Sequence, residues 1–259
     1  MKNKKLTALL LSLALAAAML TGCGSSGSAP QQSAQSAAQE SAVSGSAESL
    51  SVSGAEDQAA AAEQLLNDLT GTYEQLWPVL LDARYHDIWL KDCAAIVGNE
   101  NAQATADKLI SMVTADIYGE DAVKAYKDNP DGAAYNCSFT QGLYHLTFDG
   151  TTISGVDVNG NVLFSHTYHF IGMEESRGFY EFESDDPDAG EFTYFFLAPD
   201  TPNTTFHIEF RYGADKEALA SLDSGAYAYW MASGIPTNHD QKMIENCIEL
   251  FCRENLAEQ

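Results

Sequence analysis

Hydrophobic residues follow two different patterns along the chain after residue 59. In the first stretch they recur every three or four positions, the period of an amphipathic helix. This pattern predicts helices over residues 59–69, 73–81, 88–97 and 102–118. Pro78 is expected to break or kink the second of these helices, because proline lacks a backbone N–H.

The second stretch alternates apolar and polar residues, as half-buried strands do. We expect six strands, over residues 143–148, 153–158, 162–171, 178–183, 191–198 and 205–212. Asp149-Gly150 and Asn159-Gly160 separate the first three strands and favour tight hairpin turns. Short hairpins predict an antiparallel sheet or barrel. A helix over residues 239–252 follows, with Asn238 and Gln241 spaced as a capping box.

The first 22 residues have the layout of a secretory signal. A basic start precedes an apolar run over residues 6–20, which is shorter than the ~20 residues that a spanning helix needs. The run ends in Leu20-Thr21-Gly22-Cys23, which resembles the bacterial lipoprotein cleavage box. That resemblance implies that residues 1–22 are removed and that Cys23 carries the lipid. The mature protein is then extracytoplasmic and anchored to the bacterial cell membrane by this lipid.

Composition divides the rest of the chain into two parts. Residues 23–59 are mostly Ser, Ala, Gly, Gln and Glu without any aromatic residue, so we expect a disordered tether. Residues 60–259 contain every Trp, Tyr, Phe and His, and they have the size of one domain.

Charge and cysteine content limit the function. The chain has 13 Lys and Arg against 37 Asp and Glu, a net charge of −24. Removal of residues 1–22, which hold three Lys and no acid, leaves 10 − 37 = −27. Such acidity argues against a nucleic-acid partner. An exported domain can form disulfides, and we expect one or two bridges, with buried free thiols as the alternative and the pairing open, among Cys93, Cys137, Cys247 and Cys252. No nucleophile–base motif is evident, so we expect no enzyme.

The strand over residues 205–212 contains the most interesting histidine. Its alternation places Thr205, His207, Glu209 and Arg211 on one face. His207 and Glu209 then project side by side and can give two ligands to one metal ion. The alternative is a polar sheet face with a Glu209–Arg211 ion pair.

Several blocks of the second half resemble the ZinT (YodA) family of extracytoplasmic zinc- and cadmium-binding proteins. The strongest runs from Arg177 to Phe192 and ends in Asp-Asp-Pro-Asp-Ala-Gly-Glu-Phe. Four other blocks also resemble the family and occur in the same order along the chain: Leu69 to Pro78, Ala198-Pro199, Phe206-His207-Ile208 and Lys216 to Leu219. The resemblance covers most of residues 68–250. It implies a mainly β (α+β) fold, a calycin-like or lipocalin-like antiparallel β-barrel with flanking N-terminal and C-terminal helices.

The chain departs from this family at the metal ligands. The family binds zinc through three His, and the corresponding positions hold Phe195, Thr205 and His207. An alignment shifted by two residues places His207 and Glu209 at the second and third of these ligand positions instead. A tight site needs three or four ligands, so further ligands would come from other strands, for instance from His145, His166 or His169. We expect the His207 ring to point into the barrel beside such donors.

Two hypotheses remain open from the sequence. In the first, the chain is a lipid-anchored protein that binds a divalent metal ion, zinc, at His207 and Glu209 and supplies a metal ABC importer. In the second, a barrel of the same kind has lost the metal and binds another small ligand or a protein partner. An aromatic pocket would then surround Phe195, built from Tyr194, Phe196, Tyr227, Tyr229 and Trp230.

Overall fold

The computed structural model describes residues 46–174 and 176–256. The predicted signal peptide, Cys23 and residues 24–45 of the predicted tether lie outside the described residues. The end of that tether differs from the prediction, because the 23-residue helix α1 (Ser46–Asp68) includes residues 46–59. Seven of the 14 residues in this stretch are Ala, Glu, Leu or Gln, which favour helix. None of the helices in the described ranges is both long and apolar enough to cross a membrane.

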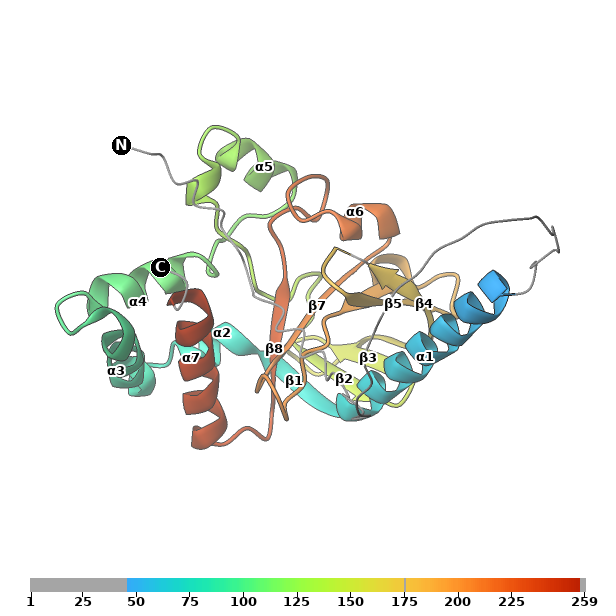
Figure 1. The fold of residues 1–259 in the computed structure, drawn as a ribbon, viewed down its shortest axis with the longest axis horizontal. Helices are drawn as coiled ribbons and strands as arrows, with labels where there is room; N and C mark the ends of the chain where they lie inside the picture. The colour runs from blue at the N-terminus through green and yellow to red at the C-terminus, as the bar shows by residue number, and fades with distance from the viewer. Residues whose placement is uncertain (1–45, 175, 257–259) are drawn as a thin grey trace, which may run out of the picture.

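In the described part of the chain, eight antiparallel strands form a closed barrel. Figure 1 shows how helices surround it. Each strand pairs with the next along the chain, and β8 pairs with β1 to close the barrel, so that no edge stays unpaired. This confirms the predicted antiparallel barrel with flanking helices. The strands are β1 (Gly71–Gln75), β2 (His145–Asp149), β3 (Thr152–Val156), β4 (Val162–Glu174), β5 (Phe179–Ser184), β6 (Tyr194–Leu197), β7 (Ile208–Gly213) and β8 (Ala232–Pro236).

Aromatic rings fill the inside of the barrel. The ring centroids of Phe164 on β4 and Phe195 on β6 are 6.0 Å apart, although β5 separates these strands in the sheet. The two rings therefore meet across the interior. Phe195 also stacks on Tyr212 of β7 at 5.4 Å and on Phe210 at 6.3 Å. These residues mark the inward face of β6 and β7, and the residues that alternate with them face outward.

Most helices gather on one side of the barrel. Figure 1 shows α2, α3, α4 and α7 together beside β1 and β8, whereas α1 runs along the other side, where it contacts β2 and β4. Rings of Trp77, Trp89 and Phe251 lie 5.0–6.4 Å apart and join α2, α3 and α7. The helices after α1 are α2 (Leu76–Leu80), α3 (His86–Val97), α4 (Ala102–Ser111), α5 (Glu120–Tyr126), α6 (Lys216–Ala220) and α7 (Gln241–Leu256), with 3₁₀ turns η1 (Ala83–Tyr85), η2 (Pro130–Gly132) and η3 (Gly190–Phe192).

The local turn and cap predictions differ in their outcome. The β2–β3 and β3–β4 hairpins are confirmed, with Gly150 and Gly160 at φ +57° and +82°. The C-terminal helix is confirmed, but its cap is not the one expected. The Asp240 carboxylate, rather than Asn238, accepts a hydrogen bond of 2.8 Å from the Met243 N–H.

Two strands of the barrel were not predicted from the sequence pattern. The first, β1, takes the beginning of the helix predicted over residues 73–81, which in the structure starts only at Leu76. The second, β8, reads Ala-Ser-Gly-Ile-Pro, and all five residues are buried, so it shows no alternation. Its Gly234 allows close packing, since a Cβ there would lie 3.1 Å from the Ile208 side chain. The helix predicted over residues 102–118 ends earlier, at Ser111.

Candidate metal centre

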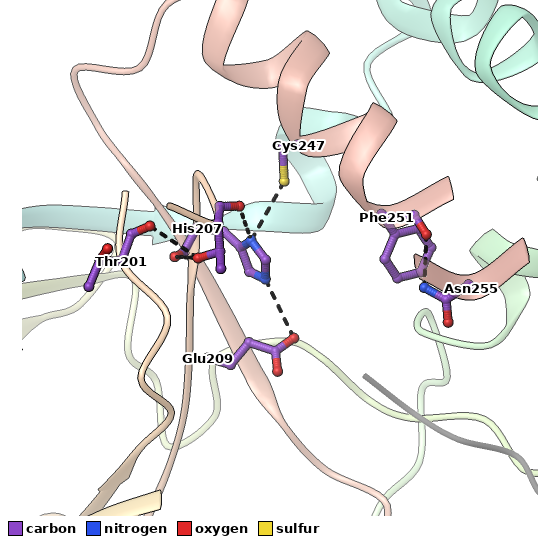
Figure 2. A network of polar contacts seen from close by, with 7 residues as sticks. Thr201, His207, Glu209, Cys247, Phe251 and Asn255 are labelled. Carbon is purple, nitrogen blue, oxygen red and sulfur yellow. Dashed lines mark hydrogen bonds and ion pairs between the residues drawn. The ribbon is translucent and has the colours of Figure 1, made fainter. Parts of the chain in front are cut away.

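His207 and Glu209 lie on the outer face of β7, not in the barrel lumen as expected from the sequence. Phe210 and Tyr212 face inward, so Glu209, which alternates with them, faces outward. His207 precedes β7 by one residue and lies beside Glu209. Both side chains are nevertheless buried, with 11% and 9% of their surfaces exposed. The helical layer covers this face, because Cys247 of α7 approaches the His207 ring (Figure 2).

The two nitrogens of the His207 ring have different neighbours. Nδ1 lies 2.6 Å from the carbonyl oxygen of Thr205. A carbonyl only accepts hydrogen bonds, so Nδ1 carries the hydrogen. Nε2 faces the Glu209 Oε1 at 3.7 Å (Figure 2). In the neutral ring, therefore, Nε2 holds the lone pair. A metal-binding histidine has the same arrangement, in which the other ring nitrogen donates to a carbonyl or carboxylate.

The segment before β7 fixes the position of this ring. Phe206 has φ +65°, a left-handed conformation that is uncommon for residues with a Cβ. The Thr205 N–H donates to the Thr201 carbonyl at 2.9 Å, and the Thr205 hydroxyl lies within reach of the carbonyls of Thr201 and His207. The backbone turns sharply here and brings the Thr205 carbonyl against Nδ1. Such strain is often found at functional positions.

Several acidic groups surround His207. Burial alone lowers its pKa, but Cys247, Glu209 and Asp200 raise that pKa well above the ordinary value. Burial and the negative charge of Glu209 raise the pKa of Asp200 to about 6, while His207 opposes this shift. On α7, burial is also the main cause that raises the pKa of Glu254. The groups around His207 thus favour the charged form of its ring.

The separation between His207 and Glu209 fits an ion between them. Zinc binds nitrogen and oxygen at about 2.0–2.2 Å, so two ligands of a tetrahedral ion lie roughly 3.4 Å apart. The 3.7 Å between Nε2 and Oε1 is close to this value and too long for a direct hydrogen bond. Cys247 does not join the pair, since its Sγ lies 3.8 Å from Nδ1, on the other side of the ring. Across the described parts of the chain, no three His, Cys, Asp or Glu side chains are arranged to hold one ion.

The other predicted donors lie elsewhere. His169 contacts Asp185 at 2.7 Å, and His166 contacts Asp186 at 3.1 Å. The His145 ring packs on Tyr144 with centroids 4.5 Å apart. These three histidines, named as possible sources of further ligands, therefore have other partners in the structure.

The Glu209–Arg211 pair, which was the alternative from the sequence, is also not formed. The Arg211 guanidinium is fully buried and donates to backbone carbonyls, of which that of Ser221 is 2.9 Å away. The guanidinium also donates to the backbone carbonyls of Leu219 and Tyr227. The charged neighbour of the Glu209 carboxylate is therefore His207 and not Arg211.

One polar atom without a hydrogen-bond partner lies on the strand next to Glu209. Ser233 of β8 is its cross-strand neighbour, and its hydroxyl has no hydrogen-bond partner among the described residues. The same holds for the indole N–H of Trp77. Burial raises the pKa of the Cys137 thiol, and Glu209 raises it further, whereas Ser233 and Trp77 oppose the shift. A hydroxyl without a partner beside a buried carboxylate is typical of a place where water binds.

The other two family ligand positions cannot contribute. Phe195 is fully buried inside the barrel and is opposite Tyr212, so it lies on the face away from His207. The hydroxyl of Thr205 faces backbone carbonyls. The aromatic pocket expected around Phe195 is likewise filled, because its ring is stacked among those of Phe164, Phe210 and Tyr212.

A separate cavity of about 220 Å³ lies in the helical layer. It is mostly apolar and is lined by residues of α2, η1, α3 and α4, among them Leu80, His86, Trp89, Asp107 and Ile110. Neither His207 nor Glu209 lines it, so this cavity is distinct from the candidate metal centre.

No known family profile matches the chain, and no curated protein matches it. Among solved structures, the Zn(II)-bound ZinT-like domain of Streptococcus pneumoniae AdcA is similar at 16% identity with a TM-score of 0.46; the match covers 71% of this chain and 89% of that domain. Zn(II)-bound AdcA from the same organism is similar at 15% identity and a TM-score of 0.43, with 71% of this chain and 35% of that chain covered. Both are likenesses of fold alone.

Proposed function

We propose that this protein binds a divalent metal ion, zinc, between His207 and Glu209. The arrangement of the His207 ring carries the proposal. Its Nδ1 is held by the Thr205 carbonyl, and Nε2 is directed at a carboxylate oxygen 3.7 Å away. Imidazole and carboxylate together suit zinc better than calcium or magnesium, which prefer oxygen alone. The role is capture of an ion, not catalysis.

The same geometry indicates a site that releases its ion readily. Structural zinc sites have four protein ligands, whereas two protein ligands leave the remaining positions to water. Asp200 and Glu254 add negative charge beside the pair without being in ligand position. We therefore expect moderate affinity and fast exchange, which suit a protein that passes its ion on.

Location and charge support the same role. We propose that lipid on Cys23 holds the protein on the extracytoplasmic side of the cell membrane. The net charge of −24, or −27 without residues 1–22, raises the local concentration of cations. A membrane importer of metal ions would be the recipient.

Calorimetric titration of the metal-free full chain with Zn²⁺ tests the proposal. We expect one ion per chain, with affinity lowered about tenfold or more by Glu209→Gln and binding lost in His207→Ala. Two buffers of different ionisation enthalpy reveal the proton that the ring must release to bind the ion.

His169→Ala is the matched control, because it removes an exposed histidine that also faces a carboxylate. Circular dichroism shows whether each variant is folded. Zinc binding that persists in folded His207→Ala and Glu209→Gln contradicts the site. Absence of binding to the wild-type chain favours the alternative of a metal-free barrel with another ligand or a protein partner.

A further inference from the structure

Two cysteines from distant parts of the chain meet in the helical layer. Cys93 lies in α3 and Cys252 in α7, 159 positions apart, and their Sγ atoms are 3.7 Å apart. Both side chains are fully buried. The helices that carry them pack against each other, next to the rings of Trp89 and Phe251. All four cysteines of the described residues are free thiols in the structure, so the bridges expected from the sequence are not formed there.

The distance between the two sulfur atoms is short enough for a bond to form. A disulfide has a sulfur–sulfur length of ~2.05 Å, so the two atoms need to approach by roughly 1.6 Å. Rotation of the two side chains with a small shift of α7 supplies such a movement. No other pair of cysteines among the described residues has its sulfur atoms in contact.

Each of the other two cysteines faces a different partner. Cys247 lies beside the His207 ring, and Cys137 lies beside Ser233 and Trp77. Cys247 and Cys252 are both in α7, five residues apart. Five residues turn a helix through roughly 500°, so these two side chains point about 140° apart and cannot bridge. The connectivity that the sequence left open is thus reduced to one pair.

We propose that Cys93 and Cys252 form a structural disulfide that joins α3 to α7, while Cys137 and Cys247 stay reduced. Because the pair is buried in the native fold, the bond forms during folding, while the sulfur atoms are still accessible. One thiolate attacks the disulfide of an oxidised thiol carrier and forms a mixed disulfide. The second thiolate then displaces the carrier thiol. The protein loses two protons and two electrons, and the carrier disulfide is reduced to two thiols.

The bond would fix the helix that covers the candidate metal centre. α7 carries Cys252 at the α3 contact and Cys247 at the His207 ring, so a covalent link at the first position restrains the second. It also closes a loop of 159 positions, for which the stabilisation of the folded state is large.

Peptide mapping under non-reducing conditions tests the proposal. The full chain is denatured, reduced, refolded in a mixture of reduced and oxidised glutathione, denatured again and alkylated. Digestion uses trypsin, which cuts after Lys91 and Arg253, and an endoproteinase that cuts after Glu249 and so separates Cys247 from Cys252. We expect a cross-linked peptide pair that contains Cys93 and Cys252, and alkyl groups on Cys137 and Cys247.

Two controls sharpen the result. Cys137→Ser should leave the cross-linked pair intact. A reductant should lower the melting temperature of the oxidised wild type by roughly 5–15 °C, but should not affect a Cys93→Ala/Cys252→Ala variant. Alkylation of both Cys93 and Cys252, or a cross-link from either to another cysteine, overturns the proposal. This outcome does not depend on metal binding, so the two proposals fail separately.

Discussion

Two histidine–carboxylate pairs of this protein have similar composition but different environments. His169 and Asp185 are 54% and 57% exposed and make a direct contact of 2.7 Å through Nδ1. His207 and Glu209 are 11% and 9% exposed, and 3.7 Å separates Nε2 from the carboxylate. The exposed pair is a solvated surface contact. The buried pair keeps Nδ1 on a backbone carbonyl and leaves a gap of the right size at Nε2.

This difference shows that pairing alone does not define a site. Water screens the exposed pair, so its contribution to stability is small. The buried pair lies where charges are costly unless they compensate one another. Asp200 and Glu254 interact with the same imidazolium. His207 therefore stabilises several carboxylates at once, and each prediction below tests one part of that claim.

The largest effect is expected from removal of the imidazole in each pair. His207→Gln leaves buried carboxylates without their cation and should lower the free energy of unfolding by about 3 kcal/mol. His169→Gln should change it by less than about 0.5 kcal/mol. Urea denaturation of both variants at neutral pH, without metal, measures the two effects. Equal losses would contradict the distinction between the pairs.

Local alternation explains why the sequence predicted the proximity of His207 to Glu209. Residues two apart on a strand share a face, whatever the rest of the fold does. The same pattern could not reveal which face is the interior, because every residue of β7 is buried. One face of β7 packs inside the barrel and the other lies under the helical layer.

The rest of the site depends on long-range packing. Cys247 is 40 positions away from His207 and reaches it only because α7 docks on the outside of the barrel. The strand β8, which holds Ser233 next to Glu209, has no alternation from which it could be predicted. The barrel was nevertheless predictable, since its hairpins depend on local turn residues at Gly150 and Gly160.

The pH dependence of stability should reveal the charged state of His207. Its pKa in the folded protein lies above the ordinary value, which is about 6.5 in an unfolded chain. The folded state thus binds the proton more tightly. The stabilisation is complete below about pH 6.5 and is lost as the pH rises through the folded pKa.

We therefore expect the stability difference between wild type and His207→Gln to be largest near about pH 6 and to shrink at higher pH. Urea denaturation across this range measures it, and the imidazole signals in NMR spectra give the pKa directly. A difference that grows with pH would show that the neutral ring, rather than the imidazolium, is the stabilising form.

A smaller effect than that of His207→Gln is expected at Asp200, and its sign is opposite. Burial and Glu209 raise the pKa of Asp200 to about 6, so at pH 7 this half-buried carboxylate is ionised at a cost. Asp200→Asn removes that cost and should stabilise the metal-free protein by about 1 kcal/mol at pH 7. The folded pKa lies above the unfolded value, so the wild type loses stability relative to the variant as the pH rises from about 4 to about 6.

Urea denaturation of wild type and Asp200→Asn at several pH values checks this, and the gain should vanish below about pH 4, where Asp200 is protonated in both states. Loss of stability at pH 7 would show that the ionised Asp200 is needed to balance His207. Zinc titration of the same variant tests whether Asp200 contributes to metal binding. If the Asp200→Asn variant is more stable than the wild type but binds zinc more weakly, the charge of Asp200 serves metal binding and not the stability of the fold. The charge of Asp185 in the exposed pair has no such role.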